Sequence, residues 1–139
     1  MKNKTLSIYT DGASRGNPGP AGIGVVIFDG RKKIKELYKY IGESTNNVAE
    51  YRALALGLEE AHALKAHEVI VNLDSELVVK QLTGEYRVKD SALKALFGKS
   101  VRLLSEFAHF EIRHVTREKN HAADKLANKA INLSSLFPV

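Results

Sequence analysis

Four acidic residues stand beside apolar strands or on the predicted inner faces of helices, where acids are uncommon. Together they could hold hard metal ions. Asp11 and Asp74 each follow a mostly apolar run that predicts a buried strand. Glu50 lies at the N-terminal end of a helical stripe that is otherwise apolar or small, and Asp124 falls in the first turn of a last helix. Carboxylates without His or Cys are ligands that suit Mg²⁺ or Mn²⁺. If the four converge, the chemistry they indicate is that of a divalent-metal site.

Taken singly, three of these acids have an ordinary explanation. Asp11 before Gly12 could form a turn, Asp74 could cap a helix, and Asp124 could favour a helix dipole. Glu50 is harder to explain, because a carboxylate on a buried face is costly unless something compensates it. Ligand sites form outside the carboxyl ends of strands, so adjacent parallel strands would bring Asp11 and Asp74 together. Clustered carboxylates repel one another, and only cations or raised pKa values relieve that repulsion.

The composition indicates one domain over residues 1–139, with residues 134–139 as a loosely packed tail. The chain has no cysteine, which excludes disulfides and thiolate chemistry. No apolar run approaches membrane-spanning length and no signal peptide is evident, so we expect no membrane association, a cytoplasmic protein and a monomer without a protein partner. The net charge of +5 and pI of about 9.4 suit a polyanionic ligand.

The order of predicted elements is βββαβααβα, an α/β fold. Alternating and apolar runs predict the strands, and the 3.6-residue period predicts the helices. The first three strands read as an antiparallel meander, with Asp29-Gly30 as a tight hairpin turn, and the later strands as parallel crossover strands. Thr45 or Asn46 could cap the first helix, and Thr116 or Asn120 the last. The expected strands are 6–10, 22–28, 33–41, 68–74 and 110–115, and the expected helices are 48–64, 75–82, 91–107 and 120–133.

Four ordered segments resemble the ribonuclease H family, specifically its type-one branch that lacks a basic protrusion. The segments are 9–22 (YTDGASRGNPGPAG), 44–54 (STNNVAEYRAL), 73–77 (LDSEL) and 115–127 (VTREKNHAADKLA). They span nearly the whole chain, and a lone Thr-Asp-Gly would be far less specific. The resemblance implies a ribonuclease H-like mixed five-stranded sheet, three antiparallel strands followed by parallel strands, with helices packed on both faces.

The resemblance also implies an activity and a cofactor. It implies an endoribonuclease that hydrolyses the RNA strand of RNA–DNA hybrids and leaves 5′-phosphate and 3′-hydroxyl ends. Asp11, Glu50, Asp74 and Asp124 correspond to the metal-binding acids of the family. Two Mg²⁺ ions, or Mn²⁺ in their place, can supply an activated water and neutralise the phosphate. Asp11 would bridge both ions, Glu50 and Asp74 would hold one, and Asp124 would hold the other.

The same resemblance implies contacts with the hybrid. A ribonuclease must read the 2′-hydroxyl of RNA in the shallow minor groove. Asparagines in turns are usually only turn formers, so these roles come from the aligned motifs. The positions that match RNA contacts are Gly12, Ser14, Glu50 and Glu76; those that match contacts to DNA or bases are Asn17, Asn46 and Asn47; and Thr45 matches a residue that holds a DNA phosphate.

Three features depart from the family pattern. The segment Gly84–Asp90 is too short and too poor in cations for a basic protrusion, so hybrid affinity would come from elsewhere, with the hairpin cations of 31–35 as candidates. Glu76 stands where the family usually has Gln, and a carboxylate is unfavourable near phosphates. Many relatives carry a mobile His before the last acid; Arg117 is our candidate for that role, and His121 is the rival. The hairpin candidates are Arg31, Lys32, Lys33 and Lys35.

Two other functions fit the same fold. The chain could be a non-catalytic module that binds hybrid or RNA, or a metal nuclease that acts on double-stranded RNA or branched DNA. A pure binding module gains nothing from four mutually repelling carboxylates, so the sequence favours the enzyme.

Overall fold

The elements of the structure follow the predicted order. A computed structural model of the chain describes residues 4–136. It contains β1 (Thr5–Ser14), β2 (Gly19–Asp29), β3 (Lys32–Ser44), α1 (Asn46–Ala63), β4 (Glu68–Leu73), α2 (Glu76–Leu82), α3 (Ser91–Ser105), β5 (His109–His114) and α4 (His121–Leu136).

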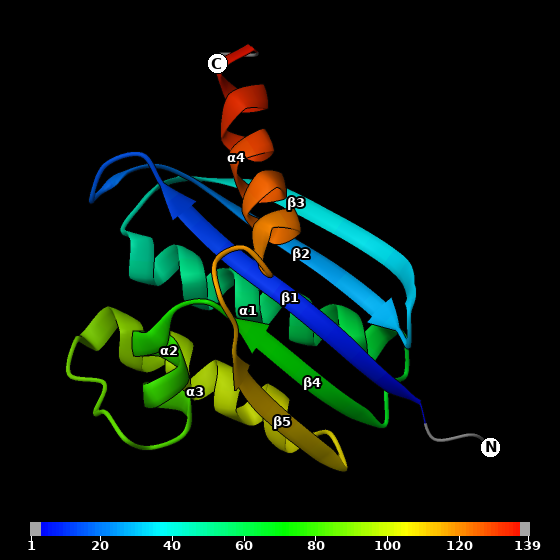
Figure 1. The fold of residues 1–139 in the computed structure, drawn as a ribbon. Helices are drawn as coiled ribbons and strands as arrows, with labels where there is room; N and C mark the ends of the chain where they lie inside the picture. Colours follow the sequence, from blue (N-terminus) through cyan, green and yellow to red (C-terminus); the bar gives the residue numbers. More distant parts are fainter. Residues whose placement is uncertain (1–3, 137–139) are drawn as a thin grey trace.

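The five strands form one mixed sheet in the order β3-β2-β1-β4-β5, which confirms the predicted fold class. β1 pairs with β2 and β2 with β3 in antiparallel fashion, whereas β1, β4 and β5 run parallel. β1 therefore lies at the centre, between the antiparallel and the parallel halves (Figure 1). The carboxyl ends of β1 and β4 point the same way, as the convergence of Asp11 and Asp74 requires.

Helices cover both faces of the sheet, as predicted. α4 crosses one face in front of β1 and β2, and α1 lies behind the sheet (Figure 1). Side chains of β2 alternate between these two helices. Val25 and Ile27 are fully buried in the main core with Leu54 and Leu58 of α1. Val26, on the opposite face, packs with Ala123 of α4.

Glycine lets α4 lie directly against the sheet. A Cβ atom at Gly24 would lie 2.2 Å from the carbonyl oxygen of Ala123, and one at Gly22 would lie 2.3 Å from that of Ala127. Both distances are far too short for a side chain, so only hydrogen fits between β2 and the backbone of α4. This close packing fixes the depth at which the first turn of α4, with Asp124, meets the sheet.

Asp11 lies inside a strand, so the prediction that it ends one was wrong. β1 continues to Ser14 because it keeps pairing with β2, and Asp11 stands opposite Gly24 in that ladder. What stops near Asp11 is the parallel pairing with β4, whose last pair is Tyr9 with Asn72. The two central strands therefore separate at the acid, and one edge of β1 is open there.

The helix ends agree with the predicted capping residues in part. Thr45 caps α1, because its Oγ1 accepts a hydrogen bond of 3.3 Å from the backbone N–H of Val48. Ser75, and not Asp74, caps α2, so the carboxylate of Asp74 is not used as a cap. α4 continues beyond 133 to Leu136, so the predicted end was wrong. Of the loose tail predicted over 134–139, residues 134–136 belong to α4, and 137–139 lie outside the described residues.

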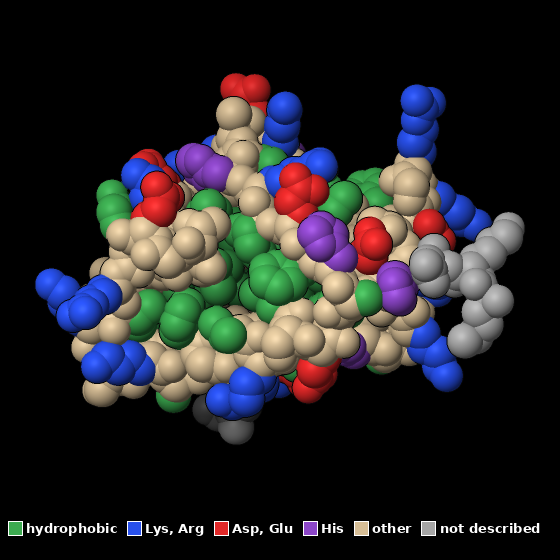
Figure 2. All heavy atoms as spheres, turned by 90° about the horizontal axis from the view of Figure 1, so that it is seen from below, with side chains coloured by type: hydrophobic (Ala, Val, Ile, Leu, Met, Phe, Trp, Pro, Cys, Tyr) green, Lys and Arg blue, Asp and Glu red, His purple; other side chains and the backbone are tan. Residues whose placement is uncertain are grey.

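Figure 2 views the molecule from below, from the side where β5 lies in Figure 1. Figure 2 shows hydrophobic side chains gathered in the middle of this face, with basic, acidic and histidine side chains around them. Phe110 of β5 is 40% exposed. Within residues 4–136, no helix combines the length and apolar character needed to cross a bilayer.

Candidate active site

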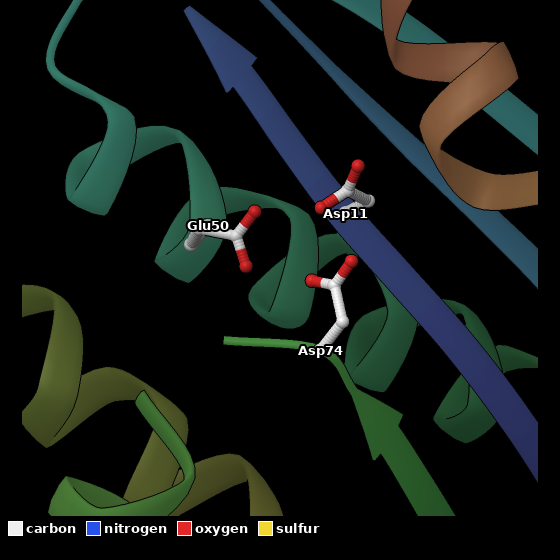
Figure 3. Close-up of side chains that lie close together, drawn as sticks. All are labelled: Asp11, Glu50 and Asp74. Atoms are coloured by element: carbon white, nitrogen blue, oxygen red, sulfur yellow. The ribbon is translucent and has the colours of Figure 1, made fainter. Parts of the chain in front are cut away.

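Three acids from three elements meet at the open edge of β1. Asp11 comes from β1, Glu50 from the beginning of α1, and Asp74 from the residue directly after β4. Each offers one carboxylate oxygen such that all three oxygens lie within 4.8 Å of one another. The three carboxylates point toward a common centre (Figure 3). Residues 63 positions apart in the chain thus form one acidic cluster.

Asp124 joins this cluster from the opposite side, through the first turn of α4. It lines the same open pocket, whose volume is about 500 Å³, and its carboxyl group helps to raise the pKa of Asp11. The lining is dominated by polar groups, and consists of Asp11, Gly12, Ala13, Ser14, Asn46, Glu50, Asp74, Ser75, Arg117, Asp124 and Asn128.

Gly12 brings α1 and β1 close enough to bury Glu50. Its backbone N–H donates a hydrogen bond of 2.8 Å to Oε1 of Glu50. A Cβ atom at Gly12 would lie 2.2 Å from the carbonyl carbon of Ala49, so no larger residue fits there. Glu50 is only 3% exposed, and its second oxygen, Oε2, is buried without a hydrogen-bond partner among the described residues.

Burial and mutual repulsion shift the acids toward their protonated forms. Burial is the main cause that raises the pKa of Asp11 well above its ordinary value, and the hydrogen bond and charge of Glu50 raise it further. Burial also raises the pKa of Glu50, although hydrogen bonds from Asp11 and from the Gly12 N–H oppose that shift. Without a counter-charge, the pair therefore holds on to protons at pH values where ordinary carboxyl groups are ionised.

Two neighbouring side chains stabilise the ionised form of Asp74. Burial raises its pKa, while the side-chain amide of Asn120 and the positive charge of Arg117 lower it. Asn120 is itself fully buried, and its Nδ2 donates a hydrogen bond of 2.9 Å to the carbonyl oxygen of Thr10. One asparagine therefore connects the loop before α4 to both central strands of the sheet.

The donor set fits a divalent cation. All ligand atoms are carboxylate oxygens, which hard ions such as Mg²⁺ and Mn²⁺ prefer. The unpartnered Oε2 of Glu50 is a buried lone-pair site that a cation would satisfy. Raised acid pKa values are the electrostatic sign of a site that lacks positive charge.

The chain is similar to several known proteins over most of its length. Residues 9–130 match the family described as reverse transcriptase-like. The N-terminal ribonuclease H domain of Rv2228c from Mycobacterium tuberculosis has a TM-score of 0.92 and 41% identity, covering 96% of this chain and 98% of that one. LC11-RNase H1, solved with an RNA/DNA hybrid, has a TM-score of 0.89 and 46% identity, covering 94% and 99%. The ribonuclease HI of Halobacterium salinarum is 44% identical over 125 residues, which are 89% of this chain.

The chain belongs to the ribonuclease H family. It spans 36% of the length of the bifunctional protein Rv2228c and 63% of the Halobacterium ribonuclease HI. Within residues 4–136, no additional helix stands between α2 and α3, in the segment that the sequence predicted to be too short for a basic protrusion. The other residues predicted to contact substrate can now be located relative to the four acids.

The predicted substrate residues divide into two groups. Ser14 and Asn46 line the pocket beside Gly12, and the Ser14 hydroxyl donates a hydrogen bond of 2.7 Å to the carbonyl oxygen of Ser44. Asn17 lies outside the pocket, where its Oδ1 accepts a hydrogen bond of 3.1 Å from the N–H of Asn46. The structure thus brings the turn after β1 against the start of α1.

The other predicted residues lie at the rim. Thr45 and Asn47 flank Asn46 at the start of α1, both half-buried. Glu76 is exposed and its carboxylate lies 2.7 Å from Nζ of Lys80, so this acid already has a partner. Arg117 lines the pocket, whereas His121 is an exposed residue at the start of α4 and is not part of the lining.

Sequence reasoning missed two site residues, Asn120 and Asn128. The sequence pattern predicts only a possible cap at Asn120 and assigns no role to Asn128. Asn128 lines the pocket, and its Nδ2 donates to both Oδ1 and the carbonyl oxygen of Asp124. The spacing of four residues between Asp124 and Asn128 was the available signal, because such residues are neighbours on a helix.

Proposed function

We propose that this chain is a metal-dependent endoribonuclease that hydrolyses the RNA strand of RNA–DNA hybrids, leaving 5′-phosphate and 3′-hydroxyl ends. The observation that carries the proposal is the meeting of the Asp11, Glu50 and Asp74 carboxylates within 4.8 Å in an open pocket. Its similarity to LC11-RNase H1, which was solved with an RNA/DNA hybrid, supports the choice of substrate.

The four acids would together coordinate two Mg²⁺ ions, and Mn²⁺ suits the same oxygen donors. Glu50 and Asp74 would hold one ion, Asp124 the other, and Asp11, which lies between them, would contact both. When bound, the ions supply an activated water and neutralise charge on the scissile phosphate. No side-chain nucleophile is then required, and none of the residues that line the pocket is a cysteine or histidine.

The chain's own polar groups would orient the hybrid. The backbone of Gly12–Ser14 forms one wall of the pocket, beside the Glu50 carboxylate, and is suited to read the 2′-hydroxyl in the minor groove. Asn46, with Asn17 bonded to its N–H, would contact the DNA strand or the bases, as would Asn47. Thr45 would hold a DNA phosphate. Glu76 is the weakest candidate for an RNA contact, because it pairs with Lys80.

Arg117 would assist proton transfer or product release, in the position where many relatives have a mobile histidine. It lines the pocket, and its positive charge lowers the pKa of Asp74, so its guanidinium lies near that carboxylate. We expect Arg117→Ala to lower kcat more than it raises KM, and His121→Ala to change neither. Steady-state kinetics on a labelled hybrid measure both; an unchanged kcat in Arg117→Ala would remove Arg117 from the mechanism.

The decisive experiment offers matched hybrid, duplex RNA, duplex DNA and branched DNA to the protein, with Mg²⁺ and with EDTA. We expect cleavage of the hybrid alone, only with Mg²⁺, and none by Asp11→Asn. Hybrid binding without cleavage by the wild type would favour the non-catalytic module. Cleavage of duplex RNA or branched DNA would favour the wider group of metal nucleases.

The cellular setting follows from the same proposal. An enzyme for RNA–DNA hybrids needs access to nucleic acid, and we propose the cytoplasm as its compartment. The hybrid is the one partner we propose for this chain. Because the chain spans only part of several relatives, proposals about partners apply to this region.

A further inference from the structure

Asp124 is held in a different way from the other three acids. It approaches from α4, and it is not among the three acids whose oxygens lie within 4.8 Å of one another. Its main hydrogen-bond partner is Asn128, one helical turn further on. Nδ2 of Asn128 lies 3.3 Å from Oδ1 of Asp124 and 3.0 Å from its carbonyl oxygen. The amide therefore restrains both the side chain and the backbone of the fourth acid.

Arg15 decides which way the Asn128 amide points. Its guanidinium donates to Oδ1 of Asn128 at 3.3 Å and to the Asn128 carbonyl oxygen at 3.5 Å. A guanidinium has donors and no acceptor, so it selects the amide oxygen. The amide nitrogen must then face Asp124. Arg15 lies in the turn after β1, which means that the chain of contacts joins the strand of Asp11 to the helix of Asp124.

We propose that Asn128 is a positioning residue for Asp124, and that Arg15 acts through Asn128 to fix its amide. This inference rests on the proposed function, because it assigns both residues to the presentation of a metal ligand. Residues that hydrogen-bond to ligating carboxylates orient them, and their loss typically costs about 10–100-fold in metal affinity. A helix held only by packing would leave the Asp124 side chain free to rotate, whereas the donated hydrogen bond selects one rotamer.

Arg15 could instead contact the substrate, and the experiment must distinguish that role from an effect through Asn128. It is exposed, and an exposed arginine beside an active site could bind a phosphate of the substrate directly. In that case its removal would weaken hybrid binding and leave ion binding in the free protein unchanged. If Arg15 acts through Asn128, its removal should weaken ion binding in the free protein.

The test is calorimetric titration of the full chain with Mn²⁺ in the absence of nucleic acid. Asp124→Asn defines which binding event depends on Asp124. We expect Asn128→Ala to weaken that event by about 10–100-fold, and Arg15→Ala to weaken it less. Because the two act in series, the double variant should be no weaker than Asn128→Ala alone. Lys125→Ala, which removes an exposed cation from the same turn, is the matched control and should bind Mn²⁺ as the wild type does.

Thermal melting of each variant without Mn²⁺ separates positioning from folding, and we expect similar midpoints. Unchanged Mn²⁺ affinity in Asn128→Ala would overturn the inference, and additive losses in the double variant would overturn the relay. An Arg15→Ala variant that changes only the KM for hybrid would do the same. A wild type that binds no Mn²⁺ but still requires it with hybrid would also overturn the inference; a wild type that neither binds Mn²⁺ nor cleaves hybrid would refute the proposed function itself.

Discussion

At the scale of single residues, the four acids differ in the neutral N–H groups that lie beside them. Asp11 has the fewest such groups. Every neighbour that shifts the pKa of Asp11 is an acid that raises it, in addition to burial. Glu50 and Asp124 each accept a hydrogen bond from a neutral N–H group, and a neutral amide lowers the pKa of Asp74. Where Asp11 is ionised, only a cation would offset its charge, which supports the proposal that it would contact both ions. These neutral groups are the Gly12 N–H beside Glu50, the Asn128 amide beside Asp124 and the Asn120 amide for Asp74.

Asp11→Asn should therefore separate stability from activity. Removing a buried, repelled carboxyl group should raise the free energy of unfolding in EDTA by about 1 kcal/mol or more, a rise in Tm of roughly 3 °C for a domain of this size. The same change should abolish hybrid cleavage. Melting curves in EDTA and a cleavage assay with Mg²⁺ measure the two effects. A variant that is less stable and still active would contradict the assignment.

The raised pKa values of Asp11 and Glu50 also set the pH dependence of stability without metal. The folded state retains protons that the unfolded chain releases above about pH 4, so the stabilisation is complete below that pH and is lost as the pH rises through the raised pKa values. Urea unfolding in EDTA between pH 5.5 and 8 should show a falling free energy of unfolding, by up to about 1.4 kcal/mol per pH unit for each retained proton. Asp11→Asn should flatten this slope, and so should added Mg²⁺. Equal slopes in wild type and variant would trace the effect to other groups.

At the scale of elements, two close contacts position the site, and both depend on glycine. Gly12 lets the start of α1 reach β1, and Gly24 lets the first turn of α4 reach β2. Glu50 and Asp124 stand within one turn of these contacts. The two helices thus meet opposite faces of the sheet at fixed depths, and the acids they carry reach Asp11 from both sides.

Gly24→Ala should destabilise the fold, because its Cβ would lie 2.2 Å from the Ala123 oxygen and 2.8 Å from the Ala127 nitrogen. Overpacking of this kind costs about 1–3 kcal/mol or more. Gly98→Ala is the matched control: it lies in α3, its Cβ would have its nearest neighbour at 3.6 Å, and a helical glycine replaced by alanine should gain about 0.5–1 kcal/mol. Urea unfolding of both variants measures the difference. If Gly24→Ala is as stable as the wild type, α4 does not rest on β2 as described.

The sequence predicted the elements well, because their signals are local. The apolar run of β4 and the helical period of α1 need no tertiary information. The end of β1 needed it, since Asp11-Gly12 has the composition of a turn and only the ladder with β2 keeps it extended. α4 continues to Leu136, although the Ser134-Ser135 pair has the composition of a helix end.

The candidate site was predictable in its acids and not in the groups that hold them. The acids stand out because their apolar surroundings make them costly. Asn120 and Asn128 are unremarkable in a helix start and a helix, and their importance depends on what packs beside them. Arg15 in a glycine-rich turn likewise gains meaning only from the 3.3 Å contact with Asn128.

At the scale of the whole molecule, the cations at the tip of the β2–β3 hairpin lie far from the acids. Leu6 pairs with Asp29, so the tip lies near the start of β1, and Asp11 is five residues further along, roughly 16 Å away. Lys33 already lies 2.9 Å from Glu36, and Lys35 pairs with Glu60. The structure therefore gives the hairpin a smaller part in hybrid affinity than the sequence suggested.

Arg31→Ala combined with Lys32→Ala should leave hybrid affinity within about twofold, because neither cation reaches the site. Binding is best measured in the Asp11→Asn background, which prevents cleavage, over a series of salt concentrations. The affinity of both proteins should fall with salt, as for any phosphate-dominated contact. A salt slope smaller by about 1 or 2 in the hairpin variant would mean that its cations do contact phosphates.

The open edge of β1 has a consequence for how the chain can vary in length. Side chains alternate along a strand, so odd and even positions point to opposite faces. Inserting one residue between Tyr9 and Asp11 would move the acid into the place of Gly12, where no Cβ fits against Ala49. An insertion there would take the acid out of the site, whereas most residues of the connection between α2 and α3 are exposed, so we expect it to tolerate changes in length. Length variation among functional relatives should therefore accumulate in that connection and be absent from the few residues around Asp11.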